Sequence, residues 1–350
     1  MKANKIIIWI VLSIILTSCF KENYRIFTRV DRDGSCQREI YTQADSIHDD
    51  IFFPYDLSSD WIISQTDTVI EEHLSQKNKK HMKISKKFQS IAALPNGLRS
   101  DKVFPMSKES LKKRFRWFYT YYTFTATYPE LTDKGSVPMD KYLTEAEQKF
   151  YLQGKLSAYR GMSGMELKEK LDDIEVCFMN WYSHSMYGLC FDVVSYHASV
   201  TDIEFHTQLI AIKDSLYAVN KEQLAAGLGS ASLDDVCELL DKYFTTAVFS
   251  TLYAEKREEM DSMLEEKTSV VNEYSKFDIR YELVLPGKIL ATNTDLQNNG
   301  VLAWNINLFR FLADDYTLTA ESRAVNVWAF AVTLLLIVFA AYCFGKIRSI

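Results

Sequence analysis

The sequence lacks the spacing patterns that mark metal sites. None of its six histidines belongs to a His-Glu-x-x-His motif, and no Cys-x-x-Cys pair is present. Since zinc sites commonly draw their ligands from such closely spaced residues, we predict no metal site. The histidines are His48, His73, His81, His184, His197 and His206. We expect His184 and His197 to be hydrogen-bonded structural residues of a helix.

Motifs for nucleophiles and phosphates are also lacking. The segment Gly161-Met162-Ser163-Gly164 does not have the Gly-x-Ser-x-Gly spacing, and we interpret it as a turn followed by a helix cap. Gly227-Leu228-Gly229 lacks the third glycine and the lysine of a phosphate loop. We expect the acid pairs Asp172-Asp173 and Asp234-Asp235 at helix starts, where they complement the helix dipole. No catalytic residue and no cofactor is therefore predicted.

Glycine and proline are scarce, with 12 and 6 residues, while aromatic residues make up 13% of the chain. This composition excludes a flexible linker or a disordered protein and indicates an ordered globular fold.

Cysteines are few as well. Besides Cys19 and Cys343, which fall in the apolar ends of the chain, only Cys36, Cys177, Cys190 and Cys237 remain. We place Cys177 and Cys190 in one helix, about 20 Å apart, which is too far for a disulfide between them. We expect buried free thiols for that pair and leave the pairing of Cys36 and Cys237 open.

The N-terminus has the form of an export signal. Lys2 and Lys5 precede the apolar run Ile6–Leu16, which as a helix would rise only about 16 Å and is too short for a membrane core of about 30 Å. The tetrad Leu16-Thr17-Ser18-Cys19 resembles the lipobox of bacterial lipoproteins. This resemblance implies cleavage before Cys19 and a thioether from its thiol to diacylglycerol, with palmitate among the acyl chains. The alternative is an ordinary signal peptide with a chance cysteine.

The C-terminus carries a longer apolar run. Nineteen residues, Val327 to Gly345, would span about 28 Å as a helix, enough for one membrane crossing. Asn326 and Trp328 stand where interfacial residues belong. Lys346 and Arg348 follow the run, so the positive-inside rule places the tail in the cytoplasm. A buried core helix is the alternative, although the run has no polar stripe.

These two ends predict a bacterial cell-membrane protein, lipid-anchored and single-pass, with its bulk in the periplasm. Whether the lipid lies in the inner or the outer membrane stays open, and this compartment excludes a nucleic-acid partner.

Charge is unevenly distributed. The net charge is −6, but residues 77–116 contain 13 Lys or Arg against only Asp101 and Glu109. We expect this basic stretch either to meet anionic lipid headgroups or an acidic protein, or simply to be a solvated region that balances an acidic remainder.

The order of secondary structure indicates an α+β fold. Two β-rich runs, Tyr24–Val30 and Ser35–Thr42, flank an Asp-Gly turn and predict a hairpin. Residues 114–128 contain eight aromatics on both alternating faces, which predicts one strand covered on both sides. They are core residues on this view, or else an aromatic wall for an apolar ligand.

The pattern is helical from Pro138 to about Asn272, with Ser163, Thr201 and Ser232 as expected N-caps. Strands are expected again at 277–285, 288–292, 301–305 and 316–321.

We therefore predict an antiparallel sheet built from both chain ends, a large helical insertion and one C-terminal transmembrane helix. The predicted division is a signal peptide (1–18), an N-terminal β-rich segment (19–137), a helical insertion (138–272), a C-terminal β segment (273–325), a transmembrane helix (327–345) and a cytoplasmic tail (346–350).

One stretch resembles a known family. Tyr281 to Lys288 with its Leu-Pro-Gly turn, then Asn293, Trp304 and Leu318-Thr319-Ala320 before the terminal apolar run, resemble the LppM-type membrane lipoproteins. The resemblance covers about 50 of the 350 residues. It implies the same layout of strands before a membrane anchor, in a family whose exported domain is associated with glycolipid binding. The helical block departs from the family in length, so only the layout is carried over.

Two functions of different classes follow. The first is a non-catalytic protein that binds or assembles lipid or another envelope component. The second is an enzyme acting on envelope polymers, whose site forms only in three dimensions. An apolar cavity would favour the first, and two carboxylates or a histidine and a nucleophile within hydrogen-bond reach would favour the second.

Overall fold

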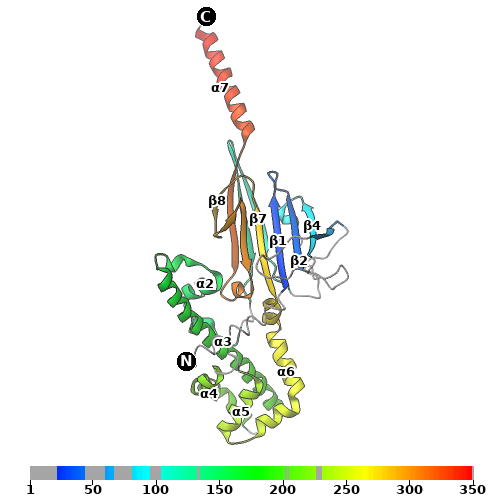
Figure 1. Cartoon of the computed structure of the whole chain (residues 1–350), viewed down its shortest axis with the longest axis vertical. Helices are drawn as coiled ribbons and strands as arrows, with labels where there is room; N and C mark the ends of the chain where they lie inside the picture. Colours follow the sequence, from blue (N-terminus) through cyan, green and yellow to red (C-terminus); the bar gives the residue numbers. More distant parts are fainter. Residues whose placement is uncertain are drawn as a thin grey trace. The chain divides into compact units, whose positions relative to one another are not determined.

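A computed structural model describes residues 22–43, 60–66, 81–94, 104–131, 135–201, 203, 205–225 and 231–348. The described chain divides into two compact units (Figure 1). A β unit combines residues 22–129, 277–307 and 315–350, and a helical unit combines 130–276 and 308–314. Several predicted features lie outside the described residues: the predicted export signal, Cys19, His48 and His73, Gly227-Leu228-Gly229 and part of the basic stretch.

The α+β class is confirmed, and strands from both chain ends share sheets. The strands of the β unit are β1 (Glu22–Val30), β2 (Cys36–Gln43), β3 (Ile62–Thr66), β4 (His81–Phe88), β5 (Lys108–Arg116), β6 (Tyr119–Tyr128), β7 (Phe277–Val284), β8 (Lys288–Thr292), β9 (Leu296–Asn298), β10 (Val301–Ile306) and β11 (Tyr316–Val325). They form two sheets where the sequence predicts one: a seven-stranded sheet in the order β3-β4-β2-β1-β7-β10-β9 and a four-stranded sheet in the order β5-β6-β11-β8.

The predicted N-terminal hairpin is present as β1 and β2, which pair from Tyr24–Thr42 to Val30–Cys36. The other edge of β1 pairs with β7, so the predicted joining of the two chain ends is confirmed. This pairing is parallel, with Glu22 opposite Phe277. A parallel neighbour was not expected. Parallel strands need a long crossover, and here the connection consists of strands β2 to β6 together with the helical block.

The four-stranded sheet corrects one prediction. Residues 114–128 are not one strand, since β5 ends at Arg116 and β6 begins at Tyr119. Along β6 the residues at even numbers from Thr120 to Tyr128 are buried while their neighbours are partly exposed. The aromatic residues occur at both odd and even positions because a turn at Trp117-Phe118 separates two strands. Within each strand the side chains still point alternately to the two faces of the sheet.

The core of the β unit lies between the two sheets. The ring of Phe124 in β6 lies 6.1 Å from that of Tyr281 in β7. The buried side chains include Tyr24, Ile26, Ile40, Ile84, Phe124, Tyr281, Leu302 and Trp304.

The predicted Pro286-Gly287 turn joins β7 to β8. Gly287 has φ +85°, and a Cβ there would lie 2.3 Å from the backbone oxygen of Arg323 in β11. Only glycine fits both the left-handed backbone and this close approach.

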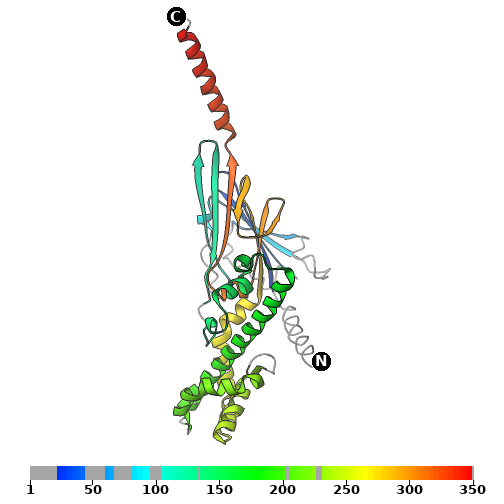
Figure 2. The ribbon, with the colours of Figure 1, turned by 90° about the vertical axis from the view of Figure 1, so that its left-hand side faces the viewer.

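β11 is followed by α7 (Val327–Arg348), the last helix of the β unit (Figure 2). Its segment Val327–Phe344 has a mean hydropathy of 2.4 and is only 6% buried. By length and composition the helix can cross a membrane. The alternative of a buried core helix does not agree with this exposure.

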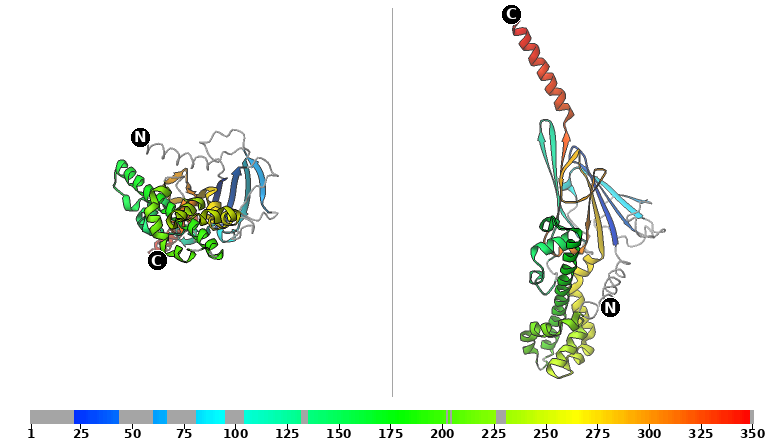
Figure 3. Two further views of the ribbon diagram at one scale, coloured as in Figure 1. Left: turned by 90° about the horizontal axis from the view of Figure 1, so that it is seen from below. Right: turned by 60° about the vertical axis from the view of Figure 1, so that its left-hand side comes forward.

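The helical unit contains α2 (Glu145–Gln153), α3 (Gly164–Val200), α4 (Leu209–Ala225), α5 (Leu233–Phe244) and α6 (Val248–Ser275). The long helices α3 and α6 run side by side (Figure 3). Their shared core with α4 and α5 includes Tyr187, Phe191, Val194, Leu216, Leu240 and Phe249.

Two of the three predicted N-caps are confirmed, because Ser163 and Ser232 each form a capping box at the start of α3 and α5. Thr201 is instead the C-cap of α3, where its hydroxyl donates to the carbonyl oxygen of His197 at 2.7 Å. The pair Asp172-Asp173 lies in the third turn of α3 and not at its start. Asp234-Asp235 does lie in the first turn of α5.

The prediction that Cys177 and Cys190 are not bonded to each other is confirmed, since both lie in the single helix α3 and are free. Cys190 is buried as expected, whereas Cys177 is only half-buried. Cys36 in β2 and Cys237 in α5 are free as well. Burial raises the pKa of the Cys36 thiol to about 11 and those of Cys190 and Cys237 to about 12. The three buried thiols are therefore protonated at neutral pH and are poor nucleophiles.

Candidate functional site

The outward face of the seven-stranded sheet is strongly polar. In β1 and β2 the residues that alternate with the buried core point to this face, and they line a shallow, open pocket of about 220 Å³. The lining residues are Arg25, Phe27, Arg29, Gln37, Glu39 and Tyr41. The two strands hold this set in place because their antiparallel register puts Arg29 opposite Gln37, Phe27 opposite Glu39 and Arg25 opposite Tyr41.

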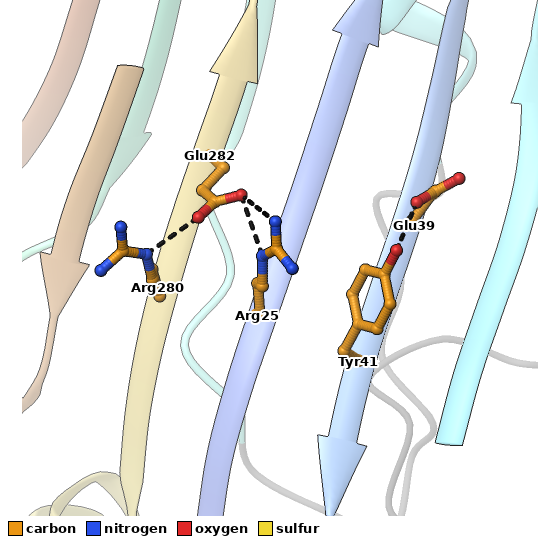
Figure 4. Close-up of polar contacts among 5 residues, drawn as sticks. All are labelled: Arg25, Glu39, Tyr41, Arg280 and Glu282. Carbon is orange, nitrogen blue, oxygen red and sulfur yellow. Dashed lines mark hydrogen bonds and ion pairs between the residues drawn. The ribbon is translucent and has the colours of Figure 1, made fainter. Parts of the chain in front are cut away.

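A carboxylate between two guanidinium groups borders the pocket. The parallel register of β1 and β7 places Arg25 directly opposite Arg280, an arrangement of like charges that would be destabilising by itself. The carboxylate of Glu282 lies between the two guanidinium groups and offsets their repulsion (Figure 4). Its Oε2 accepts from Nε and Nη2 of Arg25 at 2.9 and 2.7 Å, and its Oε1 accepts from Nε of Arg280 at 2.9 Å. This bridge fixes Arg25 at the pocket wall.

Glu39 is the acidic group of the pocket, and its oxygens are already engaged. Its Oε2 accepts from the hydroxyl of Tyr41 at 2.6 Å, and its Oε1 lies 2.9 Å from Nζ of Lys83 and accepts from Nε2 of Gln37 at 2.9 Å. Burial would raise the pKa of Glu39, but the bonds from Tyr41 and Lys83 outweigh it and hold the pKa below its ordinary value. Burial and the bond to Glu39 raise the pKa of Tyr41.

Two arginines make the pocket suitable for an anionic ligand. The guanidinium of Arg25 lies 5.2 Å from the ring centroid of Tyr41, and that of Arg29 lies 5.8 Å from the ring centroid of Phe27. Arg29 is exposed. Planar guanidinium groups held on aromatic rings suit carboxylate or phosphate oxygens, which they can bind in bidentate fashion.

The pocket lacks the group that acts most often in acid–base catalysis. That group is histidine, and a carboxylate that acts as a general acid near neutral pH needs a raised pKa. No histidine lines the pocket, and the pKa of Glu39 is lowered. The lining is also polar, unlike the apolar cavity that would be expected of a lipid binder.

A second polar cluster lies buried between the two sheets. Nη2 of Arg38 in β2 lies 2.6 Å from Oε2 of Glu109 in β5, and the hydroxyl of Tyr281 donates to the same oxygen at 2.9 Å. The hydroxyl of Thr28 donates to that of Tyr281 at 3.3 Å. Arg38, Thr28 and Tyr281 are fully buried. The cluster therefore joins the sheets and is closed to a ligand.

The histidines of α3 lie in the helical unit. His184 shares a hydrogen bond of 2.8 Å with the hydroxyl of Tyr142 and stacks on the ring of Tyr217 at 3.8 Å, so its predicted structural role is confirmed. Burial lowers the pKa of His184. His197 is buried, but its Nε2 has no hydrogen-bond partner within the described part of the chain. Within those same residues, no group of three or more potential ligands is arranged for a metal ion.

Sequence patterns did not single out the pocket residues. Alternation alone indicates that Arg25, Phe27 and Arg29 share a face, yet neither the position of β7 beside β1 nor the contact with Glu282 has a local signal. The chain matches no family model, and no curated protein and no solved structure is significantly similar to it. The likeness to LppM-type lipoproteins stays a prediction.

Proposed function

We propose that this protein is an exported, membrane-anchored binding protein, which holds an anionic component of the cell envelope on the open face of its seven-stranded sheet and does not convert it chemically. The observation that carries the proposal is α7, a helix of the β unit that leaves a long apolar surface exposed.

The exposed surface of α7 supports a membrane location. Burying apolar surface gains about 25 cal/mol per Å², so a fully apolar helix is unfavourable in water and favourable in a bilayer. The exposed residues include Leu334, Leu335, Leu336, Ile337, Val338, Phe339 and Phe344. At 22 residues the helix is about 33 Å long, which suits a hydrocarbon core of about 30 Å.

The basic residues after α7 support an orientation with the C-terminus in the cytoplasm. Lys346 and Arg348 at the end of the span favour a cytoplasmic C-terminus, which leaves the β unit on the exported side. The lipobox-like tetrad at Cys19 is consistent with a second, acyl anchor at the other end of the chain.

The pocket supports binding over catalysis. Its arginines are positioned by neighbours that are themselves paired, as Arg25 is by Glu282, so the site is preorganised for an anion. A hydrolase would need an unengaged general acid or base there, and Glu39 is engaged by three donors. A sugar acid of a lipid headgroup, a phosphate and a peptide carboxylate all present the anionic oxygens that such a site binds.

Purification from the native membrane tests the proposal. The full-length protein in mild detergent should retain an anionic envelope molecule that mass spectrometry identifies in the extract. The Arg29→Gln variant should lose most of it, because a charged hydrogen bond contributes about 1.5–3 kcal/mol, a tenfold or greater effect on occupancy. The Lys288→Gln variant, which removes an exposed charge from β8 in the other sheet, should retain it. Equal retention by both variants would contradict the assignment of the pocket.

Membrane attachment is tested separately. The full chain should stay in the membrane fraction after alkaline carbonate extraction. Release of the full chain by carbonate would contradict the membrane-spanning role of α7.

A further inference from the structure

The turn between β5 and β6 packs against the start of α7. The ring of Trp117 lies 5.4 Å from that of Trp328, edge to face, and its Nε1 donates to Oγ1 of Thr333 at 2.8 Å. The ring of Phe115 stacks on Trp328 at 6.1 Å. The ring of Phe118 lies 4.6 Å from that of Phe330. All of these residues belong to the β unit, and we call this group the aromatic tip.

The depth of this turn follows from its partners on α7. Thr333 comes six residues after Val327, which is about 9 Å along the helix axis. Each interfacial layer of a bilayer is only about 5–8 Å thick outside the hydrocarbon core. If α7 spans the membrane, the indole of Trp117 therefore lies at the boundary between headgroups and acyl chains.

The exposure of the tip fits that depth. Phe115, Trp117 and Trp328 remain 54%, 45% and 53% exposed even though they contact each other. Tryptophan and other aromatics are enriched at membrane interfaces, where one part of the ring meets apolar chains and another part meets water.

The backbone carbonyl groups of the turn are hydrogen-bonded within the protein, which suits a medium with little water. Nδ2 of Asn326 donates to the carbonyl oxygens of Arg116 and Trp117 at 3.0 and 3.2 Å, and its backbone N–H donates to that of Phe118 at 2.9 Å. Oδ1 of Asn326 accepts from the hydroxyl of Thr120 at 3.0 Å. An unpaired carbonyl is unfavourable where water is scarce, so the bonds from Asn326 favour entry of the turn into the interface.

Positive charge lies on the strand just above the tip. The register of β5 with β6 puts Arg116 opposite Tyr119, Arg114 opposite Tyr121 and Lys112 opposite Thr123, so the three basic side chains share one exposed face. The one acid of β5, Glu109, points to the other face and is paired with Arg38. From Arg116 to Lys112 the strand extends about 13 Å, a length that covers the thickness of the headgroup layer and the water next to it.

We infer that the β5–β6 turn is a second membrane contact, in which the aromatic tip lies in the bilayer interface and Arg114 and Arg116 bind anionic phospholipid headgroups. This inference rests on the proposed function, because the depth of the tip is set by a spanning α7. Of the basic stretch at 77–116, the inference assigns lipid binding only to the basic residues at the end of β5.

The contact fixes the β unit relative to the membrane plane. A single helix lets the attached domain rotate and tilt, whereas two contacts on different elements hold it in one orientation. The open face of the seven-stranded sheet then has a set direction relative to the bilayer.

Fluorine NMR of the full-length protein in vesicles tests the depth. The chain is labelled with 5-fluorotryptophan, assigned by single Trp→Phe variants, and placed in phosphatidylcholine vesicles with a lipid carrying a nitroxide near its headgroup. The signals of Trp117 and Trp328 should broaden, while Trp304, which is buried in the seven-stranded sheet, should not. Broadening of Trp328 without Trp117 would overturn the inference and leave the spanning helix intact, with the basic tip open to an acidic protein. Absence of broadening at both would contradict the proposed function itself.

A charge-matched pair tests headgroup binding. Protein extracted from vesicles of equimolar phosphatidylcholine and phosphatidylglycerol is examined by native mass spectrometry for the lipids that it retains. Arg116→Gln should lower the ratio of phosphatidylglycerol to phosphatidylcholine about five-fold at low salt, since one basic residue at the surface contributes about 1 kcal/mol. Lys108→Gln removes the same charge from the same face of β5 about 26 Å from Arg116 and should leave the ratio unchanged. An unchanged ratio in Arg116→Gln would overturn headgroup recognition.

Discussion

Arg38 and Glu109 form an ion pair of 2.6 Å between strands of different sheets, and both side chains are almost completely buried. The pair links β2, from the first hairpin, to β5 of the four-stranded sheet. Desolvation makes such a pair a weak source of net stability, but removal of one partner leaves an uncompensated buried charge.

We therefore predict that Glu109→Gln destabilises the β unit by about 3–5 kcal/mol. Urea unfolding in detergent, followed by tryptophan fluorescence, measures the loss. The double variant Arg38→Met/Glu109→Leu should recover most of it, because apolar side chains of similar volume need no partner. A loss below about 1 kcal/mol for Glu109→Gln would contradict the pairing.

The pocket makes stability dependent on pH through Glu39. Its pKa in the folded protein lies below its ordinary value near 4.5. Its contribution to stability is therefore complete above the unfolded pKa and is lost as the pH falls through the folded pKa. The difference in melting temperature between the parent protein and Glu39→Gln should be largest at neutral pH and should shrink below about pH 4.5. Tyr41→Phe, which removes one donor to Glu39, should reduce this pH dependence in part, and an equal difference at all pH values would show that the ionised form of Glu39 is not favoured.

Two glycines with positive φ provide a matched pair. Gly34 has φ +100°, and no atom lies within 4 Å of the place that a Cβ would take, so Gly34→Ala should cost only the backbone strain, about 1 kcal/mol. Gly287→Ala adds a clash with Arg323 in β11 and should cost about 3 kcal/mol or more. Thermal unfolding of both variants measures the difference. Equal costs would mean that the Pro286-Gly287 turn does not approach β11 so closely.

Acylation is predicted at Cys19. Cys19→Ser should abolish incorporation of a palmitate analogue and leave a longer precursor on a gel. Labelling that persists in the variant would assign the lipid elsewhere, and Cys36→Ser serves as the control that should label normally.

Membrane topology is predicted from the charges after α7. A cysteine added beyond Ile350 should resist an impermeant thiol reagent in intact cells, whereas Asp295→Cys, at an exposed position of the β unit, should react readily. Each is compared with the parent chain to subtract the native thiols. Reaction of the added C-terminal cysteine would reverse the orientation.

Local signals predicted those parts of the fold whose cause is local. The Asp-Gly turn of the first hairpin, the caps at Ser163 and Ser232 and the Pro286-Gly287 turn each depend on residues a few positions apart. The turn at Trp117-Phe118 was missed because it contains no glycine, proline or asparagine. Asn326, about two hundred residues later, supplies the hydrogen bonds that hold it.

The candidate site was beyond prediction for a similar reason. Arg25 and Glu282 are separated by 257 positions, and only the parallel register of β1 and β7 brings them together. Thr201 shows a limit of another kind, since a threonine at a helix boundary can cap either end. Its hydroxyl bonds back to the last turn of α3, which lies before it in the chain.

The parallel pairing of β1 with β7 sets a delay in biogenesis. The first residue of β7 follows the first residue of β1 by 255 positions. At about 5–20 residues per second, β1 leaves the ribosome about 13–50 s before its partner exists. During that interval the hairpin presents an open strand edge, a template for pairing with another chain. Until synthesis has passed Val284, this edge of the hairpin has no partner strand in its own chain, so the time that translation takes to traverse the helical block is the time during which the edge stays open.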